Sequence, residues 1–295
     1  MMKKLLKLQG LSYIHAAVTD PIFTRIITCE TAHEAWEKLK TEFQGFDKTR
    51  QMQVFNLIKE FELLRMKNTE KRLVFEASAI ASLKAQATSS SMKNPTRVEV
   101  VPAFLSERIT TMLQAKSSIY HGPIIFAHAV NLRRRALPPF PETSMGNFVW
   151  MAHVRSLPEE AKLSSLVCKM REAIRKIDSN FAKNVQGDGG IITVYDRVKE
   201  IGRVFSSAVD YVTISSWCNF GLYDVDFGWG KPMWVSGVGL SDDSTTQFLN
   251  KVVLMDARME KGIEAWLLLG EEDIAILEKD KELFAFASLN PSPFN

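Results

Sequence analysis

The spacing of hydrophobic positions changes along the chain and predicts three parts, residues 1–70, 71–123 and 124–295. The first part is predicted to be helical throughout. In the other two, short apolar runs typical of strands alternate with stretches whose apolar residues recur every three or four positions, as in helices. The sequence therefore predicts an α/β fold preceded by an all-α N-terminal segment.

Two amphipathic helices are predicted in the N-terminal segment. Residues 31–34 form a Thr-x-x-Glu capping box, in which the hydroxyl and the carboxylate each satisfy a free backbone amide. Residues 44–47 interrupt this helix, and a second helix is predicted over residues 49–66. The apolar face of the first helix consists of five residues at helical spacing, namely Ala32, Ala35, Trp36, Leu39 and Phe43.

The middle part has a mixed pattern of short elements. We expect, in order, a strand at 72–75, a helix at 76–86, a loop at 88–95, a strand at 96–101 and a helix at 102–116. The last helix is placed by Pro102, because proline is favourable at the first position of a helix, where its missing amide is not needed.

Strands and helices continue to alternate from residue 124 to the end. Strands are expected at 124–132, 147–153, 211–217, 233–238, 252–256 and 263–269, and helices at 158–185, 193–205 and after residue 271. The long helix at 158–185 is predicted to bury a stripe formed by Leu163, Leu166, Val167, Met170, Ile174 and Ile177.

Composition places the chain among ordinary globular proteins. Its 295 residues are 46% hydrophobic and 24% charged, with a formal net charge of +3. This charge is too small to indicate nucleic acid, so residues 133–135, three consecutive arginines, are interpreted as a solvated or ion-paired cluster. The chain has only three cysteines, Cys29, Cys168 and Cys218, which indicates neither a disulfide framework nor a thiolate metal site. No apolar run has the length of a membrane span, so we expect a soluble, cytoplasmic protein.

One glycine-rich loop is the strongest candidate for a special structure. Asp226, Phe227, Gly228, Trp229 and Gly230 follow an apolar strand, and glycine permits backbone angles that other residues avoid. A phosphate-binding loop would need Ser or Thr after its lysine, but this sequence continues Lys-Pro. The residues themselves favour a tight structural corner with buried aromatic rings, in which the aspartate pairs with an arginine.

This loop also carries a resemblance to a known family. The run Ser215-Ser-Trp217 followed by Asp226-Phe-Gly-Trp-Gly230 resembles the second signature of the plant BAHD acyltransferases. The resemblance extends over roughly residues 71–295, through 129–133 and 145–148 upstream of the loop and 254–258 and 262–266 downstream.

The resemblance implies both a fold and an activity. It implies a mixed-sheet, CoA-dependent acyltransferase-like domain, with residues 71–123 as a remnant of the first domain and 124–295 as the second. Such enzymes transfer an acyl group from acyl-CoA to an alcohol or amine of a plant secondary metabolite. Acyl-CoA is then a co-substrate, no tightly bound cofactor is expected, and the partners are acyl-CoA and a small acceptor.

The resemblance further implies which residues border the substrate channel. Ser215 would offer its hydroxyl to the developing oxyanion, with Ser216 beside it, while Trp217 and Asn147 would shape the channel. Asp226 would hold the glycine-rich loop of residues 226–230, here called the signature loop, through an arginine and take no part in proton transfer. The alternative interpretation is that Ser215 and Ser216 are ordinary strand hydroxyls.

The family's catalytic base is the histidine of a His-x-x-x-Asp motif, which this sequence does not contain. His15 precedes Asp20 with one residue too many between them. His128 and His153 fall on predicted strands and are interpreted as structural. We therefore assign no catalytic residue, and no metal either, because the Cys29/His33 pair offers only two ligands.

Residues 1–70 have a second resemblance. The runs at 16–20, 31–39, 43–45 and 49–52 resemble the helical, capsid-like Gag segment of copia-type plant retrotransposons, without its zinc knuckle. Two hypotheses follow. The chain is a truncated and catalytically impaired acyltransferase, or it is a non-catalytic fusion whose N-terminal helices act as a self-association module.

Overall fold

The computed structural model describes residues 28–29, 33–35, 37–38, 70–90, 92–116, 122–186, 189–190, 192–195, 199, 210–236, 250–258 and 261–292. The chain divides into two compact units, Met1–Arg65 and Met66–Asn295. In the first unit, residues 33–35 and 37–38 are helical and Ala35 is fully buried, in keeping with the predicted apolar face. The rest of the predicted N-terminal helices lies outside the described residues.

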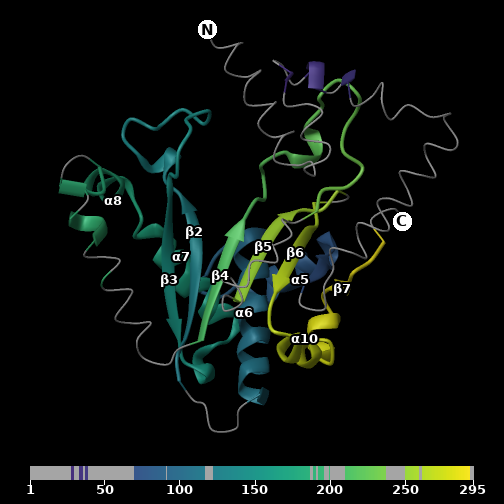
Figure 1. Ribbon diagram of the computed structural model, residues 1–295. Helices are drawn as coiled ribbons and strands as arrows, with labels where there is room; N and C mark the ends of the chain where they lie inside the picture. The colour runs from purple at the N-terminus through teal and green to yellow at the C-terminus, as the bar shows by residue number, and fades with distance from the viewer. Residues whose placement is uncertain are drawn as a thin grey trace, which may run out of the picture. The chain divides into compact units, whose positions relative to one another are not determined.

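The second unit is built on a mixed seven-stranded sheet, so the predicted α/β class is confirmed (Figure 1). The strand order is β3-β2-β4-β5-β6-β1-β7. The strands β2, β4 and β5 run parallel, and the other pairs are antiparallel. The strands are β1 (Glu70–Phe75), β2 (Ile124–Asn131), β3 (Val149–Ser156), β4 (Asp210–Ser216), β5 (Asn250–Asp256), β6 (Ile263–Leu268) and β7 (Ser288–Leu289).

Helices cover one face of this sheet and enclose the main core (Figure 1). They are α5 (Ala77–Ala87), α6 (Arg97–Lys116), α7 (Leu163–Arg175) and α10 (Glu271–Leu277), with the shorter α8 (Ser179–Asn184) and α11 (Lys281–Phe284). Phe104 of α6 meets the ring of Phe75 at 6.2 Å and that of Phe286 at 5.2 Å, both edge to face. We call this the helix face of the sheet.

The opposite side, here called the second face, has its own apolar cluster. Successive strand residues point to opposite sides of a sheet, so Val252 and Leu254 of β5 face the helices while Val253 and Met255 face away. Val253 and Met255 pack with Trp266 of β6 and with Trp217, Leu222, Trp234 and Val235 from the segment that follows β4.

The predicted strand at 96–101 is wrong, because α6 begins at Arg97. The Thr96 hydroxyl and backbone amide both donate to Glu99 Oε2 at 2.8 Å, and the Glu99 and Val100 amides return to the Thr96 carbonyl. The Glu99 carboxylate therefore caps the Thr96 amide, which is one half of a Thr-x-x-Glu capping box, a pattern present in the sequence. Pro102 lies inside the helix instead of opening it.

The predicted helix over 158–185 is divided into three pieces. Residues 158–160 form a 3₁₀ turn, α7 ends at Arg175, and α8 begins after Asp178, whose carboxylate accepts a hydrogen bond from the Phe181 amide at 2.9 Å. Asp178 therefore starts a new helix with an N-cap. The predicted stripe is nevertheless buried at Leu163, Leu166, Val167, Met170 and Ile177.

The predicted strand at 233–238 does not form over its described residues, 233–236. The Met233 carbonyl accepts from Arg258, and the Val235 amide donates to the Tyr223 hydroxyl. Side chains therefore take the main-chain groups that a neighbouring strand would pair.

Residues 71–123 supply β1, α5 and α6, which share the unit Met66–Asn295 with the later strands. Leu73, Leu83 and Ile109 from this part lie in the same core cluster as Phe126 and Leu254. The elements on both sides of residue 123 therefore fold around one core.

Candidate functional site

The residues that the sequence singles out gather at one end of the sheet. The strands β2, β4 and β5 run in the same direction, so their carboxyl ends lie together, and β3 and β6 begin at that end, where Asn131 pairs with Val149 and Asp256 with Ile263. Asn147 precedes β3, Ser215 lies near the end of β4, and the signature loop follows β4. The carboxyl ends of parallel strands are where α/β proteins commonly place ligand sites.

The signature loop is held by its own aspartate. Asp226 Oδ1 accepts hydrogen bonds from the amides of Gly228 at 2.7 Å and Gly230 at 3.0 Å. Both glycines have positive φ, 103° and 107°, a conformation that favours residues without a Cβ. The predicted tight turn is confirmed. The expected arginine partner of Asp226 stays a prediction; among the described residues the Asp226 carboxylate binds these backbone amides.

These hydrogen bonds set the charge of the loop. The amides of Gly228 and Gly230 hold the pKa of Asp226 below its usual range, because they stabilise the ionised carboxylate. The neighbouring Lys231 pairs with Asp224 at 2.8 Å. Asp226 is therefore an anion that holds the loop through its hydrogen bonds to backbone amides.

The two aromatic rings of the loop are exposed, contrary to the prediction that they are buried. Phe227 is 56% exposed and Trp229 is 48% exposed. The rings stack on each other with their centres 5.4 Å apart. The glycines on either side of Trp229 carry no side chain that could cover the rings, and the space beside them is open, so the loop presents an aromatic pair at its surface.

The serines of β4 differ in their environment. Ser215 is half-buried and shares the second face with Trp217, by the alternation of strand residues. Ser216 is exposed, and its Oγ accepts from the Cys218 amide at 3.4 Å. The Trp217 amide donates to the Leu254 carbonyl at 2.7 Å, which extends the pairing with β5 beyond the strand.

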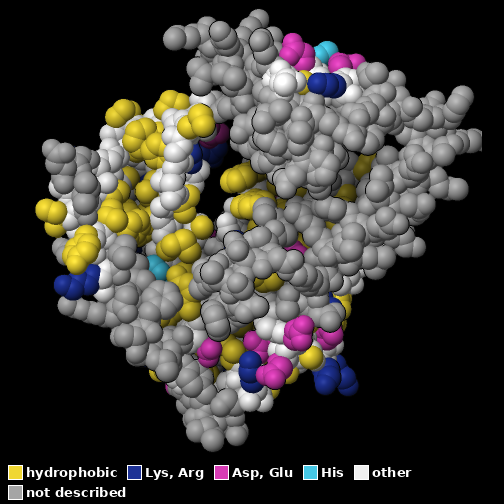
Figure 2. All heavy atoms as spheres, viewed as in Figure 1, with side chains coloured by type: hydrophobic (Ala, Val, Ile, Leu, Met, Phe, Trp, Pro, Cys, Tyr) yellow, Lys and Arg dark blue, Asp and Glu magenta, His cyan; other side chains and the backbone are white. Residues whose placement is uncertain are grey.

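Asn147 is exposed in a loop shaped by Arg133. The Arg133 guanidinium donates to the carbonyls of Ser144 and Gly146 and lies 4.7 Å from the ring centre of Phe148. The other two arginines of the cluster also have structural partners, because Arg134 pairs with Glu142 and Arg135 donates to carbonyls at the end of α7. Exposed hydrophobic side chains gather over this loop, whereas charged ones gather over α10 at the other end of the sheet (Figure 2).

Two histidines of the sheet lie on opposite faces. His128 of β2 alternates with Phe126 and Val130 toward the helices, and burial lowers its pKa to about 4. His153 of β3 is half-buried, with Nε2 3.4 Å from the Tyr211 hydroxyl, and burial lowers its pKa as well. Both imidazoles are therefore neutral near pH 7.

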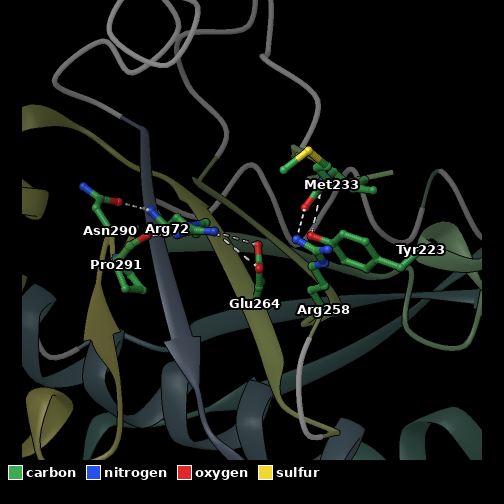
Figure 3. A network of polar contacts seen from close by, with 8 residues as sticks. Arg72, Tyr223, Met233, Arg258, Glu264, Asn290 and Pro291 are labelled. Carbon is green, nitrogen blue, oxygen red and sulfur yellow. Dashed lines mark hydrogen bonds and ion pairs between the residues drawn. The ribbon is translucent and has the colours of Figure 1, made fainter. Parts of the chain in front are cut away.

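A network of polar contacts on the second face was not predicted (Figure 3). It fixes residues 233–236, here called the strap, which continue from the signature loop. Arg258 donates to the Met233 carbonyl at 3.1 Å, the Val235 amide donates to the Tyr223 hydroxyl at 3.2 Å, and Trp234 packs 6.0 Å from Trp266. Burial raises the pKa of Tyr223, so its hydroxyl stays protonated.

A buried ion pair lies beside the strap. Arg72 is 4% exposed and Glu264 is 5% exposed, and Arg72 Nη1 lies 3.4 Å from both carboxylate oxygens. Burial raises the pKa of Glu264 against the opposing effect of Arg72. The signal that could have found Arg72 is a charged residue inside the apolar run at 72–75, which only a partner can explain.

Among the described residues, no group of three or more His, Cys, Asp or Glu side chains could hold a metal ion. Within the same residues, no helix is long and apolar enough to cross a membrane.

Similar proteins are plant acetyltransferases. The chain is 50% identical over 223 residues to the epi-neemfruitin B 7-O-acetyltransferase L7AT of Melia azedarach, covering 76% of this chain and 49% of that protein. It is 47% identical over 228 residues to a limonoid 7-O-acetyltransferase of Citrus sinensis, covering 76% and 49%. The chain thus spans about half the length of the curated relatives it matches.

Two solved structures resemble this chain over about three quarters of its length. The crystal structure of vinorine synthase matches with a TM-score of 0.56 and 28% identity, over 74% of this chain and 47% of that one. F. sporotrichioides TRI101, solved with coenzyme A and T-2, matches with a TM-score of 0.60 over 75% and 51%. Its 20% identity supports a shared fold alone.

The Transferase family matches residues 15–284, which is most of the chain. The matched range includes residues 15–70, which the sequence led us to compare with a Gag segment, and nothing found shows a Gag-like segment there. Together with the sheet, the glycine-rich loop after β4 and the resemblance of its flanks, this match shows that the chain belongs to the BAHD transferase family.

Proposed function

We propose that this chain is part of an acyl-CoA-dependent O-acyltransferase, and that this enzyme acetylates the 7-hydroxyl group of a limonoid-type acceptor. The observation that carries the proposal is the 50% and 47% identity to two proteins that are both named as 7-O-acetyltransferases. The coenzyme A bound to F. sporotrichioides TRI101, which has the same fold, supports acyl-CoA as the co-substrate.

The reaction places two demands on the protein. The acceptor hydroxyl attacks the thioester carbonyl, a tetrahedral oxyanion forms, and its collapse releases CoA as the thiol and leaves the acetyl ester. A base must take the hydroxyl proton, and a donor must stabilise the oxyanion. We assign the donor role to the half-buried Ser215, at the carboxyl end of β4.

The proton acceptor is not assigned to this chain. His128 faces the helices. His153 of β3 contacts Tyr211 at the start of β4, whereas Ser215 lies near the end of that strand. Neither belongs to a His-x-x-x-Asp motif. A general base typically contributes about 10²–10⁴ in rate, so transfer by this chain alone should be slower than that of a full-length relative by about this factor.

The first test is an acetylation assay with a 7-hydroxy limonoid and acetyl-CoA, with the ester detected by mass spectrometry. The chain is assayed alone and with a separately expressed polypeptide covering the unmatched half of the Melia azedarach relative. We expect slow transfer by the chain alone and faster transfer by the mixture. If both preparations form no ester and calorimetry detects no binding of acetyl-CoA, the proposal is wrong.

A matched pair of variants tests the role of Ser215. Removal of one oxyanion donor typically costs about 10²–10³ in kcat, so Ser215→Ala should reduce transfer by that factor. Ser216→Ala is the control, because Ser216 is the adjacent, exposed hydroxyl. If the acetylation rate of Ser215→Ala equals that of Ser216→Ala, Ser215 is not the oxyanion donor.

A further inference from the structure

The signature loop continues into the strap, and the strap lies on the second face of β5 and β6. Trp234 packs 6.0 Å from Trp266 of β6, and Trp234 and Val235 belong to the apolar cluster of Val253 and Met255. The position of the loop therefore depends on how firmly residues 233–236 are held.

Three side chains from different parts of the chain hold the strap. Arg258, after β5, binds the Met233 carbonyl, and Tyr223, before the loop, binds the Val235 amide. The third is Arg72 of β1, whose guanidinium carbon lies 5.9 Å from the ring centre of Trp234. A buried cation at this distance from an indole ring attracts it.

Arg72 is itself fixed on all sides. Its Nη1 faces Glu264, its Nη2 donates to the Pro291 carbonyl, and its backbone exchanges hydrogen bonds with Asn290 at 2.8 and 2.9 Å (Figure 3). The planar guanidinium is thus oriented by β6 and by the residues after β7. A fixed planar cation offers Trp234 a defined surface, which a flexible ammonium would not.

We propose that Arg72 is a positioning residue for the signature loop: it holds Trp234 on the sheet and so fixes the backbone of residues 226–236. The loop belongs to the site of the proposed function, so any effect of Arg72 on catalysis rests on that function. The anchoring of the loop by Arg72 of β1 can be measured without substrate.

The test is hydrogen exchange of peptides from residues 226–236, compared with peptides from α6, in the full chain below its melting temperature. In Arg72→Met, exchange in residues 226–236 should become about tenfold faster, because the cation–π contact and the fork of hydrogen bonds are lost. Unchanged exchange in these residues would overturn the proposal.

The single variant also leaves the Glu264 carboxylate buried without its partner, which destabilises the whole unit. The double variant Arg72→Met/Glu264→Gln removes both charges. We expect it to recover the melting temperature of the parent while exchange in residues 226–236 stays fast. If exchange returns to the parental rate together with the melting temperature, Arg72 acts only through the stability of the sheet.

A matched control lies on the other face of the sheet. Arg108 is 8% exposed, pairs with Glu282 and lies 5.9 Å from the ring centre of Phe104, but it does not touch the strap. Arg108→Met should leave exchange in residues 226–236 at the parental rate. An equal increase in this variant would contradict the assignment to Arg72. Failure of the acetylation assay would leave all of these outcomes readable, since none needs acetyl-CoA.

Discussion

The two faces of the sheet are stabilised by different interactions, although the same strands supply both. On the helix face, β1 contributes Leu73 and Phe75 to an apolar core with α5, α6, α7 and α10. On the second face, the same strand contributes Arg72, which is buried against Glu264 and Trp234.

This difference has a physical consequence. Apolar contacts are non-directional and are lost in proportion to the area and volume removed. Charged and aromatic contacts depend on partners at defined positions, and a missing partner leaves a buried charge. The helix face should therefore determine how stable the unit is, and the second face should determine where the signature loop lies.

The largest effect is expected from a cavity on the helix face. Phe104 is 2% exposed and contacts two other rings, so Phe104→Ala should lower the free energy of unfolding by about 3–5 kcal/mol. Urea denaturation provides the measurement. Phe227→Ala removes an exposed ring and should change the same quantity by less than about 0.5 kcal/mol. Comparable losses in both would remove the distinction between the core and the loop.

The pH dependence sharpens the comparison through His128. Its folded pKa of about 4 lies below the usual 6.5, so between these values the unfolded chain takes up a proton that the folded protein does not. Stability should therefore fall as the pH falls from 6.5 toward 4, by about 1.4 kcal/mol for each unit of pKa difference.

His128→Leu tests this assignment by removing the imidazole from the helix face. The variant should lose less free energy of unfolding than the parent between pH 6.5 and 4.5. Denaturation curves at the two pH values give both differences, whatever the absolute stability of the variant. If His128→Leu loses as much free energy of unfolding as the parent between these pH values, groups other than His128 cause the acid sensitivity.

A smaller effect is expected at the start of α6. The Glu99 carboxylate caps this helix by accepting hydrogen bonds from the Thr96 amide and hydroxyl, and it also binds Arg171 of α7 at 2.6 Å. Thr96→Ala removes the hydroxyl's hydrogen bond to Glu99 and should cost about 0.5–1.5 kcal/mol of stability, the usual net contribution of a hydrogen bond. Ser82→Ala is the control, since that exposed hydroxyl binds only a carbonyl of its own helix. Thermal unfolding of both variants decides whether the cap matters.

The smallest effect on stability, and the most local one, is expected in the signature loop. In Asp226→Asn the neutral amide oxygen is a weaker acceptor for the Gly228 and Gly230 amides. The unfolding midpoint should stay unchanged while exchange of these two amides, followed by NMR, becomes faster. Asp224→Asn removes only the contact with Lys231 and should not alter it. A large drop in the midpoint would show that the loop supports the whole unit.

Local patterns predicted much of this fold because they depend on near neighbours. The strands at 72–75, 124–132, 211–217, 252–256 and 263–269 and the helix at 76–86 follow from periodicity, and each is present within one or two residues. The errors at 96–101 and 176–178 arose where a capping side chain, Glu99 or Asp178, overrides the hydrophobic spacing.

The candidate site was predicted less completely. The sequence located the tight turn at Gly228 and Gly230, since positive φ is a property of single residues. It mispredicted the burial of the aromatic pair, because burial depends on what the folded chain places near the loop. The arginine partner of Asp226 remains a prediction. The role of Ser215 as oxyanion donor remains a prediction.

The sequence by itself determined the α/β class, the family resemblance and the turn geometry of the signature loop, which all reside in short runs of residues. Only the tertiary structure decided what fixes that loop. Arg72 is 192 positions from Glu264 and 218 from Asn290, so no local spacing connects them. They meet because β1 pairs with both β6 and β7, and a buried charge is tolerated only where the fold supplies its partners.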